Sequence, residues 1–190
     1  MRILRSVDYK RMPWKNGKGE TVELAVFPPG ASVDSFDWRI STATVAEDGP
    51  FSTFDGIDRT LSVLTGEGME LSVNEQAPVL LHPLSEPFAF AGDARTSARL
   101  TGGMITDLNV MTRRERFTHC VRSVAAHGEV TVTTEADQTV IVVTDEAQQG
   151  NLALGPRDAI LLDRGDAPLA LHFGQETAFF IIEIMPVKSA

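Results

Sequence analysis

Short runs of alternating apolar and polar residues dominate this sequence, and helical periodicity is almost absent from it. Residues 21–27 alternate in this way, and so does the segment Trp38–Val45. Side chains of a strand point in turn to its two faces, so this alternation is typical of strands with one buried face. Gly, Pro, Asp and Asn separate the runs, as in Pro28-Pro29-Gly30. The chain is therefore predicted to be all-β, an antiparallel sandwich or barrel.

The order of the expected strands contains a faint internal repeat. The further strands are expected at residues 60–65, 69–73, 79–82, 87–90, 98–101, 105–111, 117–124, 129–133, 139–144, 159–163, 169–173 and 178–185. Residues 60–65 (TLSVLT) align with 139–144 (TVIVVT), and 109–111 align with 183–185. Two similar β-barrels in one chain would explain the repeat, with one half keeping a site and the other supporting it.

The length, net charge and cysteine content of the chain disfavour several classes of protein. The chain has 190 residues, of which 43% are apolar and 23% charged, as in an ordinary globular protein. No apolar run reaches the roughly 18 residues that span a bilayer, and charges interrupt the N-terminal segment where a secretory signal would be apolar. The net charge of −9 disfavours nucleic acid as a partner, and the single Cys120 forms no internal disulfide. We expect a cytoplasmic protein that binds neither membranes nor nucleic acid.

Polar side chains recur on one face of three expected strands. They are Thr21 and Glu23, Arg39 and Ser41, and Asp107 and Asn109. If these faces point inward, they line a cavity in which Arg39 holds a carboxylate and the amide and hydroxyl groups hold the rest of a small acid. If they point outward, they simply meet water. The small Ser41 and Ala43 beside Arg39 leave room for a cavity.

Three features elsewhere in the first half stay open between a binding role and a structural one. Arg59 precedes an apolar strand and is either a solvated turn residue or a second cation at a barrel mouth. Trp14 either walls a pocket or fills a core. The run Asn16-Gly17-Lys18-Gly19 is either a backbone nest for an anion or a flexible turn.

Metal and nucleophile sites are not indicated by the residue spacing. The four histidines stand far apart in the sequence, and none is paired with another at a two-residue spacing. His119 and Cys120 are neighbours on an expected strand, so their side chains point to opposite faces and do not form a nucleophilic pair.

Several motifs of the sequence resemble those of the HutD/Ves family. They are residues 14–21 (WKNGKGET), 36–43 (FDWRISTA), 48–52 (DGPFS), 56–59 (GIDR), 88–93 (FAFAGD) and 107–114 (DLNVMTRR). They follow one another in the family's order, and the length fits the whole chain. The family's motif positions fall here on Trp14, Asn16, Thr21, Arg39, Ser41, Ser52, Arg59 and Asn109. One departure is Lys18, where the family usually has Gly, and this weakens the idea of an anion nest.

The resemblance implies a bicupin fold, in which residues 1–190 form a single unit of two tandem cupin-like barrels. Residues 1–116 would be the first cupin half with the ligand pocket, and residues 117–190 the supporting second half. Cupins that use metals carry a His-x-His pair after a glycine. This chain has none after Gly66 and Gly68. We therefore expect no metal and no other cofactor.

Family membership also implies a function connected with histidine utilisation. The first hypothesis is a cytoplasmic protein that senses an acidic intermediate, such as N-formylglutamate, and modulates that pathway. Arg39 and Arg59 would bind the carboxylate, and Asn16, Asn109, Thr21 and Ser41, beside Trp14, would bind the remainder.

Two rival hypotheses remain. One is a metal-independent hydrolase or isomerase acting on a related acid, with Glu23 or Asp107 as the general base. The other is a scaffold whose barrel has filled with its own side chains. A small carboxylated metabolite is the expected partner, and a homodimer is left open.

Overall fold

The structure is a computed structural model that describes residues 1–14 and 19–188. Its strands are β1 (Arg2–Leu4), β2 (Lys10–Pro13), β3 (Gly19–Phe27), β4 (Trp38–Val45), β5 (Gly49–Pro50), β6 (Ile57–Thr65), β7 (Met69–Val73), β8 (Val79–Leu81), β9 (Phe88–Ala91), β10 (Thr96–Leu100), β11 (Ile105–Arg113), β12 (Phe117–Val132), β13 (Gln138–Val143), β14 (Ala147–Gln149), β15 (Leu152–Leu154), β16 (Ala159–Asp163) and β17 (Leu169–Pro186). One 3₁₀ helix spans Ser6–Asp8. The prediction of an all-β chain is confirmed. In the described ranges, no helix has the length and apolar character to cross a membrane.

The chain divides into two compact units. One comprises Lys10–Thr118, and the other combines Met1–Tyr9 with the C-terminal segment from His119 to Lys188. We refer to them as the N-terminal unit and the C-terminal unit. The first nine residues thus belong to the C-terminal unit, where β1 pairs with β16.

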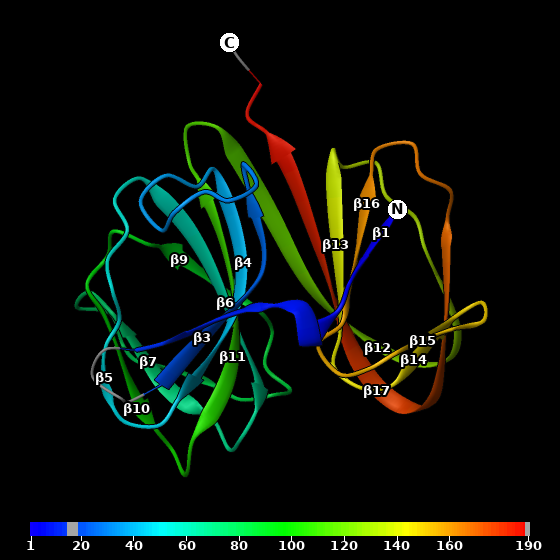
Figure 1. Ribbon diagram of the computed structural model, residues 1–190. Coiled ribbons are helices and arrows are strands. Elements are labelled where there is room, and N and C mark those ends of the chain that lie inside the picture. The colour runs from blue at the N-terminus through cyan, green and yellow to red at the C-terminus, as the bar shows by residue number, and fades with distance from the viewer. Residues whose placement is uncertain (15–18, 189–190) are drawn as a thin grey trace. The chain divides into compact units, whose positions relative to one another are not determined.

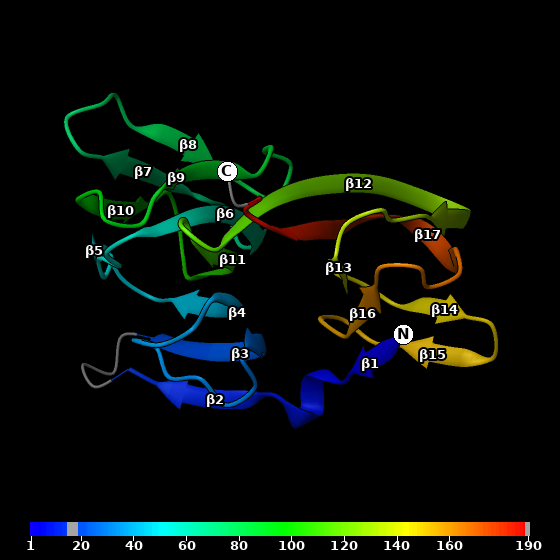
Figure 2. The same ribbon diagram turned by 90° about the horizontal axis from the view of Figure 1, so that it is seen from above.

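Two antiparallel sheets build the N-terminal unit. The larger has the strand order β2-β3-β4-β11-β6-β9, and the smaller has the order β5-β10-β7-β8 (Figures 1 and 2). Burial alternates along β7, where Met69 and Leu71 are fully buried, while β6 buries both of its faces and has Leu61 fully buried. They belong to one apolar cluster that also contains Val63 and Ile105. Both sheets contribute to this cluster, which is the hydrophobic core of the N-terminal unit.

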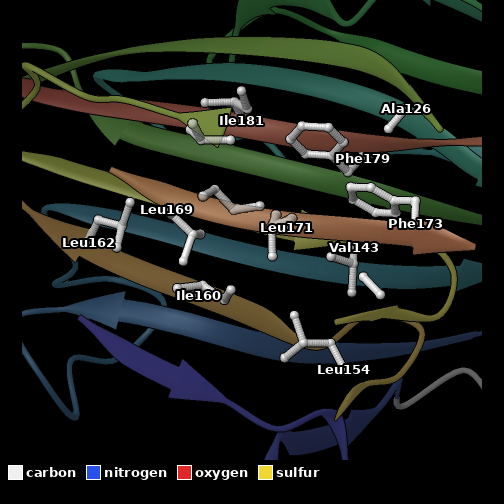
Figure 3. Close-up of a cluster of buried hydrophobic side chains, with 13 residues drawn as sticks. Ala126, Val143, Leu154, Ile160, Leu162, Leu169, Leu171, Phe173, Phe179 and Ile181 are labelled. Atoms are coloured by element: carbon white, nitrogen blue, oxygen red, sulfur yellow. The ribbon is translucent and has the colours of Figure 1, made fainter. Parts of the chain in front are cut away.

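The C-terminal unit has one seven-stranded sheet with the order β1-β16-β13-β17-β14-β15, and β12 also pairs with β17. Its interior is filled with apolar side chains. Figure 3 shows Leu171, Phe173 and Phe179 among them, with Ile160 and Val143 close by. Phe173 and Phe179 stack with ring centroids 5.2 Å apart. The buried cluster of this unit consists of apolar side chains, whereas β4, β6 and β11 of the N-terminal unit also bury polar ones.

Two expected chain breaks are absent from the structure. Residues 117–124 and 129–133, expected as two strands, lie in the single strand β12, and residues 169–173 and 178–185 lie in β17. Gly128 within β12 has φ +70°, a conformation that glycine adopts without steric cost. The strand β12 therefore continues through Gly128. The expectation also missed β1, β2, β5, β14 and β15, which have two to four residues each and are too short for a periodic pattern.

The repeated segments occupy comparable places in the two units. In the N-terminal unit, β6 contains the first repeated segment and pairs antiparallel with β11, which contains the last. In the C-terminal unit, β13 contains residues 139–143 of the matching segment and pairs antiparallel with β17, which contains residues 183–185.

Candidate functional site

A cavity of about 370 Å³ lies in the N-terminal unit. Its lining comes from β3, β4, β6 and β11, from β5 and the loop that follows it, and from Trp14, which follows β2. The lining residues are Trp14, Thr21, Arg39, Ser41, Ala43, Val45, Pro50, Phe51, Ser52, Phe54, Arg59, Asp107, Asn109 and Met111. The polar faces of three strands, singled out from the sequence, thus meet around one hollow.

Strand register places the two cavity arginines in one row. Arg39 of β4 and Arg59 of β6 both lie opposite Met111 of β11. Two residues along, Ser41 lies opposite Asn109. Side chains two residues apart share a face of the sheet, so both rows face the cavity. The alternation visible in the sequence is what sets this arrangement.

Arg39 is held by an acidic neighbour from the adjacent strand. Its Nε donates to Oε2 of Glu23 at 2.7 Å, and the two side chains are 5% and 15% exposed. The pairing of β3 with β4 shifts between Glu23 and Ala25, so a bulge follows Glu23. Glu23 itself stays in register opposite Ser41, on the cavity side. The ion pair fixes the Arg39 guanidinium at the cavity wall.

Arg59 is enclosed by an amide and two aromatic rings. Its Nε donates to Oδ1 of Asn109 at 2.8 Å. The guanidinium carbon lies 4.8 Å from the ring centre of Phe51 and 5.4 Å from that of Phe90, within cation–π range. Burial lowers the pKa of Arg59 to about 10, and the nearby Arg39 lowers it too, while Asp107 raises it. Arg59 is still a cation at neutral pH.

Asp107 is a buried carboxyl group two residues before Asn109 on β11. Its Oδ1 accepts a hydrogen bond from the Asn109 side-chain amide. Its Oδ2 is buried and has no hydrogen-bond partner among the described residues. Burial raises the pKa of Asp107 to about 7, and the Arg59 charge and the Ala43 backbone offset only part of this shift. Asn109 therefore links a buried cation to a buried acid.

Trp14 forms part of the cavity wall next to Thr21. The indole Nε1 donates to the Thr21 hydroxyl at 2.8 Å. A Cβ atom at Gly19 would lie 2.3 Å from the Thr44 carbonyl oxygen and 2.9 Å from the Trp14 ring. A side chain at Gly19 would therefore collide with the backbone of β4 and with the Trp14 ring.

Most residues predicted for the site are brought together around the cavity. Those lining it are Trp14, Thr21, Arg39, Ser41, Arg59, Asp107 and Asn109, and Glu23 contacts Arg39. Asn16 and the nest proposed around it lie outside the described residues. Sequence reasoning assigned no role to Phe51, Phe54 and Phe90. A clue to Phe51 and Phe54 is present in the sequence, because Gly49-Pro50 and Gly56 enclose them in a loop between two expected strands.

A metal centre is not formed by the described residues. Within residues 1–14 and 19–188, no three His, Cys, Asp or Glu side chains gather closely enough to hold a metal ion. Cys120 is a free, exposed thiol of β12 in the C-terminal unit.

Two curated proteins resemble part of the chain. One is described as an uncharacterized 21.2 kDa protein in the hutC 3′ region of Pseudomonas putida, 44% identical over 117 residues. The other is Protein Ves of Citrobacter koseri, 41% identical over 121 residues. The matched segments cover 62% and 60% of this chain, and the chain spans only 60% and 61% of the length of these relatives.

Solved structures resemble the whole chain. HutD from Pseudomonas fluorescens SBW25, described in a formate condition, has a TM-score of 0.82 and 34% identity, and 98% of this chain and 99% of that one are covered. A conserved protein of unknown function from Pseudomonas aeruginosa PAO1 has a TM-score of 0.84 and 32% identity, with 97% and 98% covered. A cupin 2 conserved barrel protein from Leptotrichia buccalis, 10% identical with a TM-score of 0.58, shares the fold.

These likenesses confirm the predicted bicupin fold. The family model HutD matches residues 6–180, nearly the full length of the sequence. The chain belongs to the HutD family.

Proposed function

We propose that this chain is a cytoplasmic binding protein for a small carboxylated metabolite and that it modulates histidine utilisation. N-formylglutamate is the intermediate that we propose as its ligand. The observation that carries the proposal is the position of Arg39 and Arg59, which face one cavity from a single row of the sheet.

The guanidinium groups have the chemistry to receive a carboxylate. Each carries five N–H donors in a planar fork. The bonds within the described residues use Nε of Arg39, and Nε and Nη2 of Arg59. The remaining donors are available to an acid in the cavity, and Thr21 and Ser41 add hydroxyl groups to its lining. The volume of about 370 Å³ suits a small metabolite, and it favours ligand binding over a scaffold with a filled barrel.

The link to histidine utilisation is supported by the relatives. One curated relative is named for the hutC 3′ region, and one structural relative is named HutD. The description of that HutD structure mentions formate, the smallest carboxylate. Formate is therefore a suitable minimal probe beside N-formyl-L-glutamate.

Calorimetric titration of N-formyl-L-glutamate into the wild type and Arg39→Ala tests the proposal. Loss of a charged, forked contact should cost about 1.5–3 kcal/mol, which is roughly tenfold to over a hundredfold in affinity. Arg99→Ala is the matched control, because Arg99 is an exposed residue of β10 bonded to Glu70 and does not line the cavity. Equal heats of binding for the wild type and Arg39→Ala would mean that Arg39 does not contact the ligand.

One observation favours a second candidate, a metal-independent hydrolase or isomerase. Asp107 lines the cavity, its Oδ2 has no hydrogen-bond partner among the described residues, and burial raises its pKa to about 7, which suits a general base. Glu23 is less suited because its carboxylate is bonded to Arg39. Proton NMR of the probe incubated with the protein distinguishes the candidates: conversion of the probe would favour the enzyme, and unchanged probe with stoichiometric binding would favour the sensor.

A further inference from the structure

Asp107 is an acid in a cavity that we propose to bind acids. It is only 1% exposed, and its Oδ2 is a buried oxygen with no partner among the described residues. A buried carboxylate oxygen without a donor is costly to leave charged. The usual way to lower that cost is to protonate the group.

The charged groups around Asp107 balance one another in charge. The residues facing it across the neighbouring strands are Ala43 of β4 and Val63 of β6, both apolar. The charged side chains nearby are Arg59 of β6, Arg39 of β4 and, beyond it, Glu23 of β3. With Asp107 ionised, the site holds two positive and two negative charges. An anionic ligand would add an excess negative charge to a poorly solvated space.

We propose that Asp107 takes up a proton when the cavity binds a carboxylate, so that the acid enters as its anion together with one hydrogen ion. The inference rests on the proposed function and deepens it. The proton comes from the solvent and forms an O–H bond on Oδ2 of Asp107, because Oδ1 already accepts the Asn109 amide. The ligand stays ionised against the arginines. The new O–H group is a hydrogen-bond donor, which a carboxylate ligand can accept.

Asp107 is enclosed more fully than Glu23, and its hydrogen-bond partner is a neutral group. Glu23 receives an N–H bond from Arg39 at 2.7 Å, and its side chain is more exposed, at 15%. Asp107 shares its hydrogen bond with a neutral amide and is fully enclosed. A ligand anion placed against the arginines would therefore act on a carboxyl group whose Oδ2 has no hydrogen-bond partner among the described residues, and it would favour protonation of that group.

The coupling predicts how affinity changes with pH. In the free protein, Asp107 is half protonated near pH 7, since burial raises its pKa to about 7. Below that pH the proton is already present, so the affinity should be constant. Above it, each bound ligand must bring a proton, and the affinity should fall up to about tenfold per pH unit.

The experiment is calorimetric titration of N-formyl-L-glutamate, with formate as a second probe, from about pH 6 to about pH 9. Near pH 8, titrations in two buffers of different ionisation enthalpy should show uptake of close to one proton per ligand. Asp107→Asn copies the size of the group without its titration, and we expect a pH-independent affinity and no proton uptake. Glu23→Gln is the matched control, in which the pH dependence should persist.

The outcomes separate this inference from the proposed function. If wild-type protein binds a probe with constant affinity and no proton uptake near pH 8, the inference is overturned and the proposed function stands. If Asp107→Asn retains the pH dependence, the inference is overturned as well. If neither probe binds at any pH, both fall. Should Asp107→Asn fail to fold, the proton count of the wild type decides the question without it.

Discussion

Arg39 and Arg59 stand on different strands, yet each lies in register opposite the same residue, Met111 of β11. Met111 is 3% exposed and lines the cavity between them. The strand that separates the arginines also carries Asn109, which bonds to Arg59. Three adjacent strands thus fix the spacing of two cations, and a rigid spacing of this kind suits a ligand with defined acidic groups.

The first prediction concerns the forked shape of the Arg59 side chain. Arg59→Lys keeps a positive charge but loses the planar fork, so affinity for N-formyl-L-glutamate should fall about tenfold or more in calorimetry. Arg99→Lys, on the exposed surface of β10, should leave the affinity unchanged. Equal affinity of Arg59→Lys and the wild type would mean that only the charge of Arg59 matters.

The second prediction concerns a substitution that fills the cavity. Ala43 lies on the cavity side of β4 next to Thr21, so Ala43→Leu should place its side chain in the ligand volume and abolish binding. Circular dichroism should show an intact fold, because the added atoms enter an existing space. Thr44→Val, on the opposite face of the same strand, is the control and should still bind. Ligand binding by a folded Ala43→Leu protein would place the ligand elsewhere.

The third prediction is that stability depends on pH through Asp107. The pKa of Asp107 is about 7 in the folded protein and about 3.9 in an unfolded chain, so between these values the folded state holds the extra proton. The free energy of unfolding should therefore fall as pH rises through this window, by at most about 1.4 kcal/mol per pH unit.

Asp107→Asn removes this dependence. Urea denaturation at about pH 5 and about pH 8 should show that the free energy of unfolding of the variant, relative to that of the wild type, is greater at the higher pH. A constant difference between the two proteins across this range would contradict the raised pKa of Asp107.

The fourth prediction concerns the aromatic partner of Arg59. Phe51→Leu removes the ring 4.8 Å from the guanidinium carbon and should cost about 0.5–2 kcal/mol of cation–π energy. We expect weaker binding of N-formyl-L-glutamate, measured by calorimetry, because Arg59 is less firmly placed. Phe51→Tyr keeps the ring and should bind like the wild type. If Phe51→Leu binds as tightly as Phe51→Tyr, the ring has no role in positioning Arg59.

Much of the cavity lining followed from the sequence because strand periodicity is two residues. Arg39 and Ser41, or Asp107 and Asn109, must share a face whatever the sheet does around them. The bulge of β3 falls after Glu23, so Thr21 and Glu23 also kept their common face.

The contacts among these groups could not be predicted in the same way. The bond from Arg59 to Asn109 joins residues 50 positions apart, and it depends on the register of β6 against β11. That Oδ2 of Asp107 has no hydrogen-bond partner among the described residues follows only from the positions of the neighbouring donors. The role of Phe51 depends on the path of a loop, which has no periodicity to read.

The pairing of β1 with β16 has a consequence for exchanging parts between relatives. Arg5 donates to the Asp158 carboxylate at 2.7 Å, and Tyr9 donates to the Arg157 carbonyl oxygen at 3.0 Å. The leading nine residues therefore complete the unit formed by the end of the chain. A chimera that exchanges the N-terminal unit must therefore leave residues 1–9 with the C-terminal unit, and during synthesis residues 1–9 cannot take up this structure before their partners Asp158 and Arg157 have been added to the chain.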